Sequence, residues 1–289
     1  MNRHQHYRVF LLLLLVSCLL SSCAADPAWN KPQKPFKIYG NSYYVGTRGL
    51  ASILITSPAG HVLIDGALAE SVPLIVANIR SLGLHTEDIK LIVNSHVHFD
   101  HAGGIAELQK LTGARVAASK WSADVMQKGA VPRDDPQFGT IAPIARVVRV
   151  EIFKDGDALT AGAVTVTAHL TPGHTPGGTS WTWRSCEGGR CLDLVYADSL
   201  SPVSADGFFF TSSKEYPHAL DDFERSFSFL DTTPCDILIT PHPEASNLWQ
   251  RLEQRNSNPD ALIDRNACRA LAEGFRERLA RRLAAERSK

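Results

Sequence analysis

The 289-residue chain lacks an excess of charge of either sign, because 30 lysine and arginine residues are balanced by 30 aspartate and glutamate residues. This balance provides no basic face for a nucleic acid, and no acidic tail is visible. The sequence also lacks an apolar run near the roughly 20 residues of a membrane-spanning helix, since its run from Val9 to Leu20 is much shorter. Because of the balanced charge, we expect no nucleic-acid partner.

Two catalytic motifs are also absent. No lysine has a serine three positions before it, so the Ser-x-x-Lys arrangement of a nucleophilic serine does not occur. The chain likewise lacks His-Glu-x-x-His, the helical motif of zinc peptidases. The composition is that of an ordinary globular protein, with 44% hydrophobic and 21% charged residues, and its length suits one large domain or two small ones.

Residues 1–25 have the organisation of a secretory signal peptide. Arg3 and Arg8 give a positive start to the apolar core that follows. Leu20-Ser21-Ser22-Cys23 matches a bacterial lipobox, in which Cys23 becomes a lipidated first residue, and the alternative is ordinary cleavage near Ala25. Either route predicts export to the periplasm. Membrane contact is expected only through the signal or a lipid anchor, and residues 26–289 are expected to form the mature domain.

Export makes the remaining cysteines informative. Cys186, Cys191, Cys235 and Cys268 are an even number in an oxidising compartment, which favours disulfides. The Glu-Gly-Gly-Arg segment between Cys186 and Cys191 predicts a hairpin loop across which these two can pair, and Cys235 would then pair with Cys268. Three pairings are formally possible. A metal-binding role for the thiols is the competing interpretation.

The stretch from Asn94 to Gly104 carries the strongest chemical signal. His96, His98, Asp100 and His101 fall within six positions of it. The apolar run before them predicts a buried strand, so His96 and His98 point to one side at its end, and Asp100 and His101 follow where the chain turns. Imidazole and carboxylate are usual zinc ligands, and four ligands in two directions predict two ions.

Two further histidines follow predicted strands. His174 and His242 are flanked by proline and glycine residues that restrict the backbone, and we interpret both as ligands. His169, within a predicted strand, and His218 are interpreted as structural residues. The other histidines of the chain carry no signal.

Strands and helices are predicted to alternate from residue 62 to about 128, with helices at 70–82, 103–111 and 119–128. A long loop at 129–143, rich in proline and glycine, is expected to be functional or disordered. Strands are then predicted at 146–150, 163–170, 179–184, 193–196 and 236–239, and a helix at 219–230. Ser246 and Pro259 are expected to begin the last two helices. This order suggests two similar halves packed as a four-layer sandwich.

The motifs resemble those of the metallo-β-lactamase superfamily along nearly all of the mature chain. The His-x-His-x-Asp-His signature is specific to that superfamily and is shared by many activities. The segments around His174, from Tyr196 to Ser201, and around His242 are similar to those of subclass B3, which has histidine where other subclasses have a zinc-binding cysteine. The cysteines match as well, in the pairs Cys186–Cys191 and Cys235–Cys268.

This resemblance implies an α/β fold, namely a four-layer αβ/βα sandwich of two mixed sheets with helices on the outer faces. It also implies a class B metallo-β-lactamase that hydrolyses the amide bond of penicillins, cephalosporins and carbapenems and so gives antibiotic resistance. A β-lactam would be its small-molecule substrate, and a monomer is expected.

Carried over residue by residue, the resemblance implies a cofactor of two Zn²⁺ per chain. The first zinc would be held by His96, His98 and His174, and the second by Asp100, His101 and His242. A zinc-bound hydroxide would attack the lactam carbonyl, while Asp100 orients it or relays its proton. Further residues are expected to contact the substrate: Ser199 and Ser201 through its carboxylate, and also Gln137, Phe138 and Trp29, the last of which could instead pack on the body.

Two alternatives are open. Another dizinc hydrolase of this fold, a thioesterase of the glyoxalase II type or a lactonase, would use Asp198 to bridge both metals. A periplasmic zinc-binding or scaffold protein would show no turnover, but the full ligand set with an open position argues against it. Asp65, at a predicted strand end, is either a turn residue or the partner of a ligand histidine.

Overall fold

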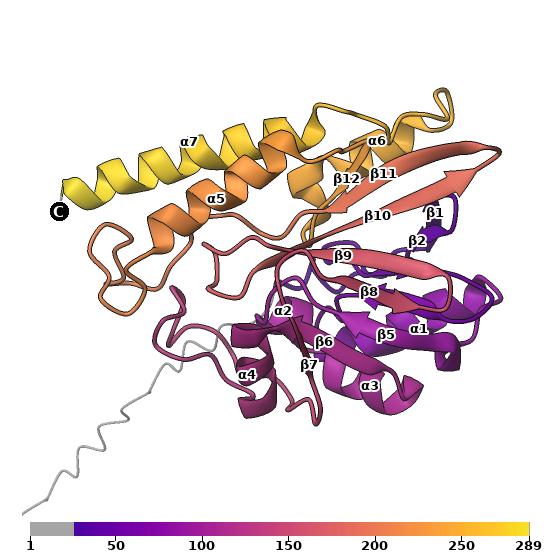
Figure 1. Cartoon of the computed structure of the whole chain (residues 1–289), viewed down its shortest axis with the longest axis horizontal. Coiled ribbons are helices and arrows are strands. Elements are labelled where there is room, and N and C mark those ends of the chain that lie inside the picture. The colour runs from indigo at the N-terminus through magenta and orange to yellow at the C-terminus, as the bar shows by residue number, and fades with distance from the viewer. Residues whose placement is uncertain (1–25, 289) are drawn as a thin grey trace, which may run out of the picture.

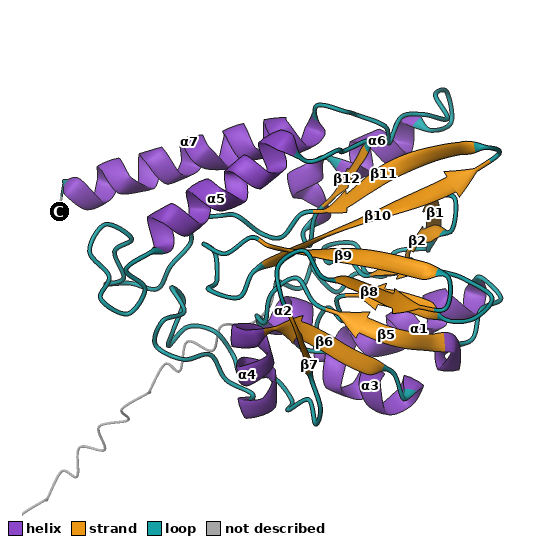
Figure 2. Cartoon of the chain, viewed as in Figure 1, coloured by secondary structure: helices purple, strands orange, loops and turns teal. Residues whose placement is uncertain are grey.

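The structure, a computed structural model, describes residues 26–288, so the predicted signal segment and lipobox lie outside the described residues. Two β-sheets pack against each other, and helices cover their outer faces (Figure 1). In Figure 2 the strands form the middle of the molecule, with helices above and below them. This arrangement is the four-layer sandwich that the order of elements predicted.

The first sheet has seven strands that follow one another in sequence order. Its first four strands pair antiparallel, and its last four pair parallel. Parallel neighbours require crossover connections, which here carry α1, α3 and α4. The strands are β1 (Phe36–Tyr39), β2 (Ser42–Tyr44), β3 (Ile53–Ile55), β4 (His61–Ile64), β5 (Ile89–Val93), β6 (Arg115–Ser119) and β7 (Glu151–Phe153).

The second sheet has five strands in the order β12-β11-β10-β9-β8. β8 to β11 form an antiparallel meander, and β12 pairs parallel with β11. The strands are β8 (Ala158–Ala161), β9 (Val164–Leu170), β10 (Thr179–Glu187), β11 (Arg190–Tyr196) and β12 (Ile237–Ile239).

Helices form the two outer layers (Figure 1). The α-helices are α1 (Val72–Ser81), α2 (Phe99–Ala102), α3 (Ile105–Thr112), α4 (Lys120–Lys128), α5 (Ala219–Thr232), α6 (Leu248–Gln254) and α7 (Ala267–Arg287). Short 3-10 helices are η1 (Ala69–Ser71), η2 (Thr86–Asp88) and η3 (Pro243–Ser246). Among residues 26–288, no helix combines the length and the apolar character needed to cross a bilayer.

Successive side chains of a strand point to opposite faces of its sheet, so each strand packs both against the other sheet and against the outer helices. In β5, Leu91 and Val93 point into the core between the sheets, whereas Ile92 packs under α1, α3 and α4. In β11, Leu194 faces the central core and Val195 faces α5 and α7. Because both faces are covered, these strands read as continuous apolar runs.

One strand was predicted in the wrong place. The segment 146–150 is not a strand, and β7 begins one residue later, at Glu151. Arg146 and Val147 bond instead to carbonyl oxygens of Lys128 and Met126, at the end of α4. These contacts hold the segment against the helix rather than the sheet edge. β8 was not predicted.

Two helix starts were also wrong. Ser246 ends η3, and the residue before α6 is Asn247, whose φ of 50° is left-handed. Pro259 lies in a turn region, and α7 begins only at Ala267. Before that helix, the Asp264 amide donates to the Asp236 carbonyl oxygen, 2.8 Å away, which ties the segment to the start of β12.

The two predicted disulfides are present. Cys186 and Cys191 lie opposite each other in the β10–β11 hairpin, as the loop between them indicated. Cys235–Cys268 joins the segment before β12 to the first turn of α7. The four thiols are therefore not metal ligands.

Candidate metal centre

The histidine-rich motif occupies the turn between a buried strand and a short helix. β5 ends at Val93, and α2 begins at Phe99 with His98 as its N-terminal flanking residue. His96 and His98 therefore lie on the connecting backbone, while Asp100 and His101 lie on the first turn of α2. All four side chains are buried.

His174, from the loop after β9, joins His96 and His98. One nitrogen from each of these rings lies within 4.8 Å of the other two. Their ring centroids are 4.8 to 5.0 Å apart, and the planes are steeply inclined, which aims nitrogens at a common point. Three converging imidazole nitrogens can hold a zinc ion and leave its fourth position open.

The far nitrogen of each ring has its own acceptor. His96 Nδ1 lies 2.7 Å from Asp198 Oδ1, His98 Nε2 lies 3.1 Å from Asp135 Oδ2, and His174 Nδ1 lies 2.9 Å from the Ser201 carbonyl oxygen. Such partners set the ring orientation and the tautomer of metal-binding histidines. The nitrogens left for a metal are thus Nε2 of His96, Nδ1 of His98 and Nε2 of His174.

Burial favours the uncharged form of these rings. It lowers the pKa of His174 to about 3, and the neighbouring His98 acts in the same direction. Burial, together with His101 and His98, also lowers the pKa of His96 well below its usual value. A neutral imidazole is the form that binds a cation.

Asp100, His101 and His242 form a second group beside the first. Asp100 Oδ2 lies 3.1 Å from His101 Nε2 and 3.3 Å from His242 Nε2. Ligand atoms of His96, Asp100 and His101 lie within 4.8 Å of one another. His242, at the start of η3, is the most exposed of the predicted ligands, with 34% of its side chain accessible. Burial would raise the pKa of Asp100, but His101 and His242 outweigh it and hold that pKa well below its usual value.

A poorly satisfied ring is the observation that suits a cation in this second group. Within the described residues, His101 Nδ1 is buried without a hydrogen-bond partner, and His101 Nε2 has only the ion-pair contact with Asp100 Oδ2 at 3.1 Å. Such a group costs free energy unless a partner arrives. The ring lies between His96 and His242, with centroid distances of 4.4 and 4.8 Å. A metal ion coordinated by His101 and Asp100 would provide the missing interaction.

Asp65 and Asp198, whose roles the sequence left open, form hydrogen bonds with residues of the histidine motif. Asp65 has a left-handed φ of 62° and accepts hydrogen bonds from the Ser95 amide, the Ser95 hydroxyl and the Tyr196 hydroxyl. It is thus a turn residue that holds the backbone before His96. Asp198 is the partner of the His96 ring, and burial, together with Asp65, raises its pKa well above the usual value. Asp198 Oδ1 is thus placed to accept the Nδ1 proton of the neutral His96 ring.

Several candidate substrate residues line the cavity of about 260 Å³ over the motif. Trp29, Gln137, Ser199 and Ser201 contribute to its walls, and the Trp29 ring also lies 5.1 Å from the His242 ring. Phe138 does not line this cavity, and its ring instead lies 5.4 Å below the Arg133 guanidinium. The sequence did not reveal the other apolar walls, which are Phe99, Ile141 and Val203.

Asp135 is the supporting residue that the sequence interpretation missed. It is fully buried, contacts His98 and accepts a hydrogen bond of 2.8 Å from the Gln137 amide. The only signal was a charged residue within the loop at 129–143, which the sequence predicts to be functional or disordered. The contact shows that this loop also supports a predicted ligand.

The two histidines interpreted as structural lie away from these groups. His169 bonds to the Thr182 hydroxyl at 2.8 Å and stacks on Phe229. His218 is exposed before α5. Neither lines the cavity over the motif.

Comparison with known proteins adds to this geometry. The profile of the metallo-beta-lactamase superfamily matches residues 45–262. The Rm3 metallo-beta-lactamase is 53% identical, with a TM-score of 0.89 over 92% of this chain and 98% of that one. MEM-A1, a subclass B3 metallo-beta-lactamase isolated from a soil metagenome library, is 48% identical, with a TM-score of 0.88 over 90% of this chain and 99% of that one.

The match to a more distant relative covers only part of the chain. The N-acyl homoserine lactonase AttM of Azorhizobium caulinodans is 28% identical over 169 residues, which are 50% of this chain and 63% of that protein. The similarity to the two solved structures thus extends over nearly all of their chains, whereas the similarity to AttM covers less than two thirds of its length.

Proposed function

The chain belongs to the metallo-beta-lactamase superfamily, and we propose that it is a zinc-dependent hydrolase of subclass B3 that opens the amide bond of β-lactam antibiotics. The observation that carries this conclusion is the convergence of His96, His98 and His174 in a buried group, in a chain 53% identical to the Rm3 enzyme over 98% of that enzyme's length.

We infer that the cofactor is a pair of zinc ions. His96, His98 and His174 would hold one ion, and Asp100, His101 and His242 the other. Nitrogen and carboxylate donors suit zinc, and the close approach of the two groups suits a dinuclear site. When bound, zinc supplies Lewis acidity and lowers the pKa of a water molecule from ~15.7 toward ~7.

The protein's own groups then position the reactants. Asp100 Oδ2 lies between His101 and His242, which leaves Oδ1 to accept a proton from the attacking water. The hydroxyl groups of Ser199 and Ser201 line the same cavity and can donate hydrogen bonds to the substrate carboxylate. Trp29, Phe99 and Ile141 provide apolar walls for the rest of the substrate.

The alternative of a lactonase or thioesterase requires Asp198 to bridge two metals. In the structure, Asp198 Oδ1 instead contacts the Nδ1 of His96, on the side of the ring opposite its free Nε2. Asp198 Oδ2 packs against Gly178, since it lies only 2.4 Å from where a Cβ on that residue would be. This geometry favours the β-lactamase assignment.

Turnover assays test the proposed function. The purified protein should hydrolyse nitrocefin and a carbapenem, and a chelator should stop both reactions until zinc is added back. An N-acyl homoserine lactone and an acyl-glutathione thioester serve as the rival substrates. Hydrolysis of either rival in preference to every β-lactam would reject the assignment, and no turnover of any substrate by zinc-loaded protein would favour a binding protein.

Removing the ring partners should weaken metal binding. We expect Asp198→Ala and Asp135→Ala each to lower zinc affinity about 10- to 100-fold, because the rings of His96 and His98 lose their orienting acceptors. Competition with a chromophoric chelator measures this directly. Asp124→Ala, which removes an exposed carboxylate from α4, is the control and should leave the affinity unchanged.

Removing both serine hydroxyls should affect substrate binding more than chemistry. We expect Ser199→Ala combined with Ser201→Ala to raise KM for carboxylate-bearing β-lactams several-fold and to lower kcat less. Steady-state kinetics at full zinc occupancy separates the two parameters. An unchanged KM would contradict the carboxylate-binding role of these residues.

We further propose that the protein is exported to the periplasm, where β-lactams act, and that it thereby gives antibiotic resistance. The charged start, apolar core and lipobox-like segment of residues 1–25 support export. The two disulfides are consistent with an oxidising compartment. The intact mass of the mature protein distinguishes lipidation at Cys23 from cleavage near Ala25, and an unprocessed chain after expression in a Gram-negative host would contradict export.

A further inference from the structure

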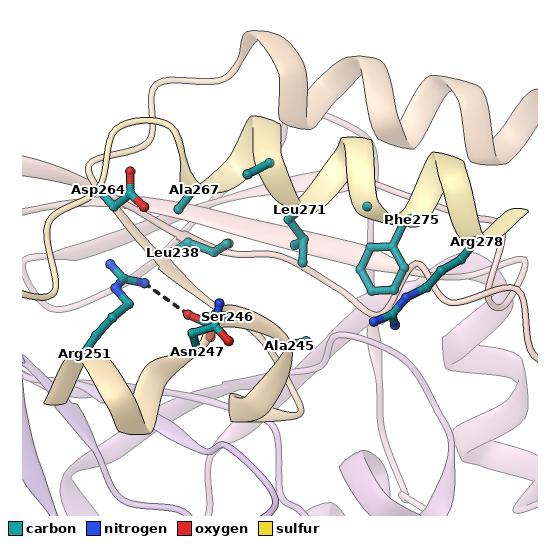
Figure 3. A pocket seen from close by; sticks show the side chains of 12 residues that line it. Leu238, Ala245, Ser246, Asn247, Arg251, Asp264, Ala267, Leu271, Phe275 and Arg278 are labelled. Atoms are coloured by element: carbon teal, nitrogen blue, oxygen red, sulfur yellow. Dashed lines mark hydrogen bonds between the residues drawn. The ribbon is translucent and has the colours of Figure 1, made fainter. Parts of the chain in front are cut away.

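A second cavity, of about 150 Å³, adjoins the cavity over the metal centre. The two cavities share Ser199, Ser201 and His242, so an occupant of the first has direct access to the second. α7 closes the far side with Phe275 and Arg278. Figure 3 shows that both side chains leave the same side of α7, with the guanidinium group beyond the Phe275 ring.

Arg278 is the only arginine or lysine among the residues that line these two cavities. The other polar groups on the shared wall are hydroxyls and one imidazole. A guanidinium stays charged at any pH of interest, and its forked donors match a carboxylate. Asp100 and Asp198 also line these cavities, so the groups there that favour an anion are the hydroxyl donors and the permanent positive charge of Arg278.

Within the described part of the chain, the positive charge of Arg278 is not paired with a carboxylate. Its neighbours on α7 form ion pairs: Arg276 with Asp231, Arg281 with Glu277 and Arg282 with Glu286. Arg278 forms no ion pair with a carboxylate of residues 26–288, and its guanidinium lies 5.2 Å from the centre of the Phe275 ring. It is exposed, so an incoming anion can reach it.

The cavity continues past Phe275 into a third space of about 220 Å³ between α6 and α7, but that space is less suited to an anion (Figure 3). Its far end is lined by the Asp264 carboxylate. The Arg251 guanidinium there already donates to the carbonyl oxygens of Ser246 and Leu262. The favourable position for negative charge is thus the end near Arg278.

We propose that Arg278 is a specificity-determining residue that attracts and binds the substrate carboxylate, together with Ser199 and Ser201. This inference rests on the proposed β-lactamase function. It assigns a substrate-binding role to the C-terminal helix, which holds Arg278 at the edge of the active-site cavity. The ligand class is a β-lactam with a free carboxylate on the fused ring.

The test compares Arg278→Gln with Arg281→Gln, which removes the same charge from an exposed position on the same helix. The substrates are a cephalosporin and the methyl ester of its ring carboxylate, assayed at several salt concentrations. For Arg278→Gln we expect KM of the free acid to rise about 3- to 10-fold with kcat nearly unchanged, since an exposed charge pair contributes modestly. The salt dependence of kcat/KM should weaken, and the ester should be unaffected.

Other outcomes would contradict either the role of Arg278 or the proposed function. Equal effects of Arg278→Gln and Arg281→Gln, or equal effects on acid and ester, would overturn the inference and leave the proposed function intact. Failure of the zinc-loaded wild-type protein to hydrolyse either compound would remove the proposed function itself. Arg278→Lys, which keeps the charge, should restore most of the affinity for the acid, and an unfolding transition like that of the wild type shows that folding is not the cause.

Discussion

The variant His98→Ala is expected to lose at least about 1,000-fold in kcat/KM for a β-lactam and to bind roughly one zinc ion instead of two. His98 provides one of the three nitrogens in the first group, and the contact of its Nε2 with Asp135 leaves Nδ1 as the nitrogen for the ion. Two remaining imidazoles do not complete a stable tetrahedral site. The buried carboxylate of Asp135 would also lose its partner. Kinetics and elemental analysis of the same preparation measure both effects.

The matched control for this variant is His169→Ala. His169 is a partly buried histidine in β9, and its ring contacts Thr182 and Phe229 rather than the metal centre. The His169→Ala variant should retain two zinc ions and nearly full activity, even if its thermal stability falls slightly. Full turnover by His98→Ala, or an equal loss in both variants, would contradict the ligand assignment.

The second large effect concerns stability. Replacing Cys235 and Cys268 together by serine should lower the free energy of unfolding by about 4 kcal/mol, because the disulfide closes a loop with a sequence separation of 33. A change of that size corresponds to a decrease in Tm of about 7 °C for a domain of this size. The bond attaches the first turn of α7 to the segment before β12, so the helix that bears Arg278 should also become less well positioned.

The hairpin disulfide provides the comparison. Cys186 and Cys191 are separated by only five positions, and replacing both by serine should cost about 2 kcal/mol by the same chain-entropy argument. Calorimetry of the two double variants measures the loss of Tm in each and shows which disulfide stabilises the protein more. A larger loss of Tm in the Cys186 and Cys191 variant than in the Cys235 and Cys268 variant would show that loop length does not govern the stabilisation here.

The local sequence was sufficient to predict the metal-binding elements. β5 is apolar on both faces, so it had to be a buried strand, and His96 and His98 follow it at a spacing of two. His174 and His242 were identifiable because proline and glycine restrict the backbone around each. The predictions failed where a contact with a distant element decides the conformation. The segment 146–150 is rich in valine, which favours a strand, but bonds to the end of α4 hold it outside the sheet.

The amino-acid order by itself determined the fold class, the family resemblance and the six candidate ligands, because each depends on residue type and on spacing along the chain. It left three cysteine pairings open, of which the resemblance favoured the one observed. Only the tertiary structure decided that Asp135 and Asp198 support His98 and His96, that Asp65 holds the preceding turn and that Phe138 is outside the cavity. It also decided that Arg278, far along the sequence, lines the same cavity as Ser199 and Ser201. Hydrogen bonds and Coulomb interactions act over a few ångströms through space, so sequence separation does not reveal which groups will meet.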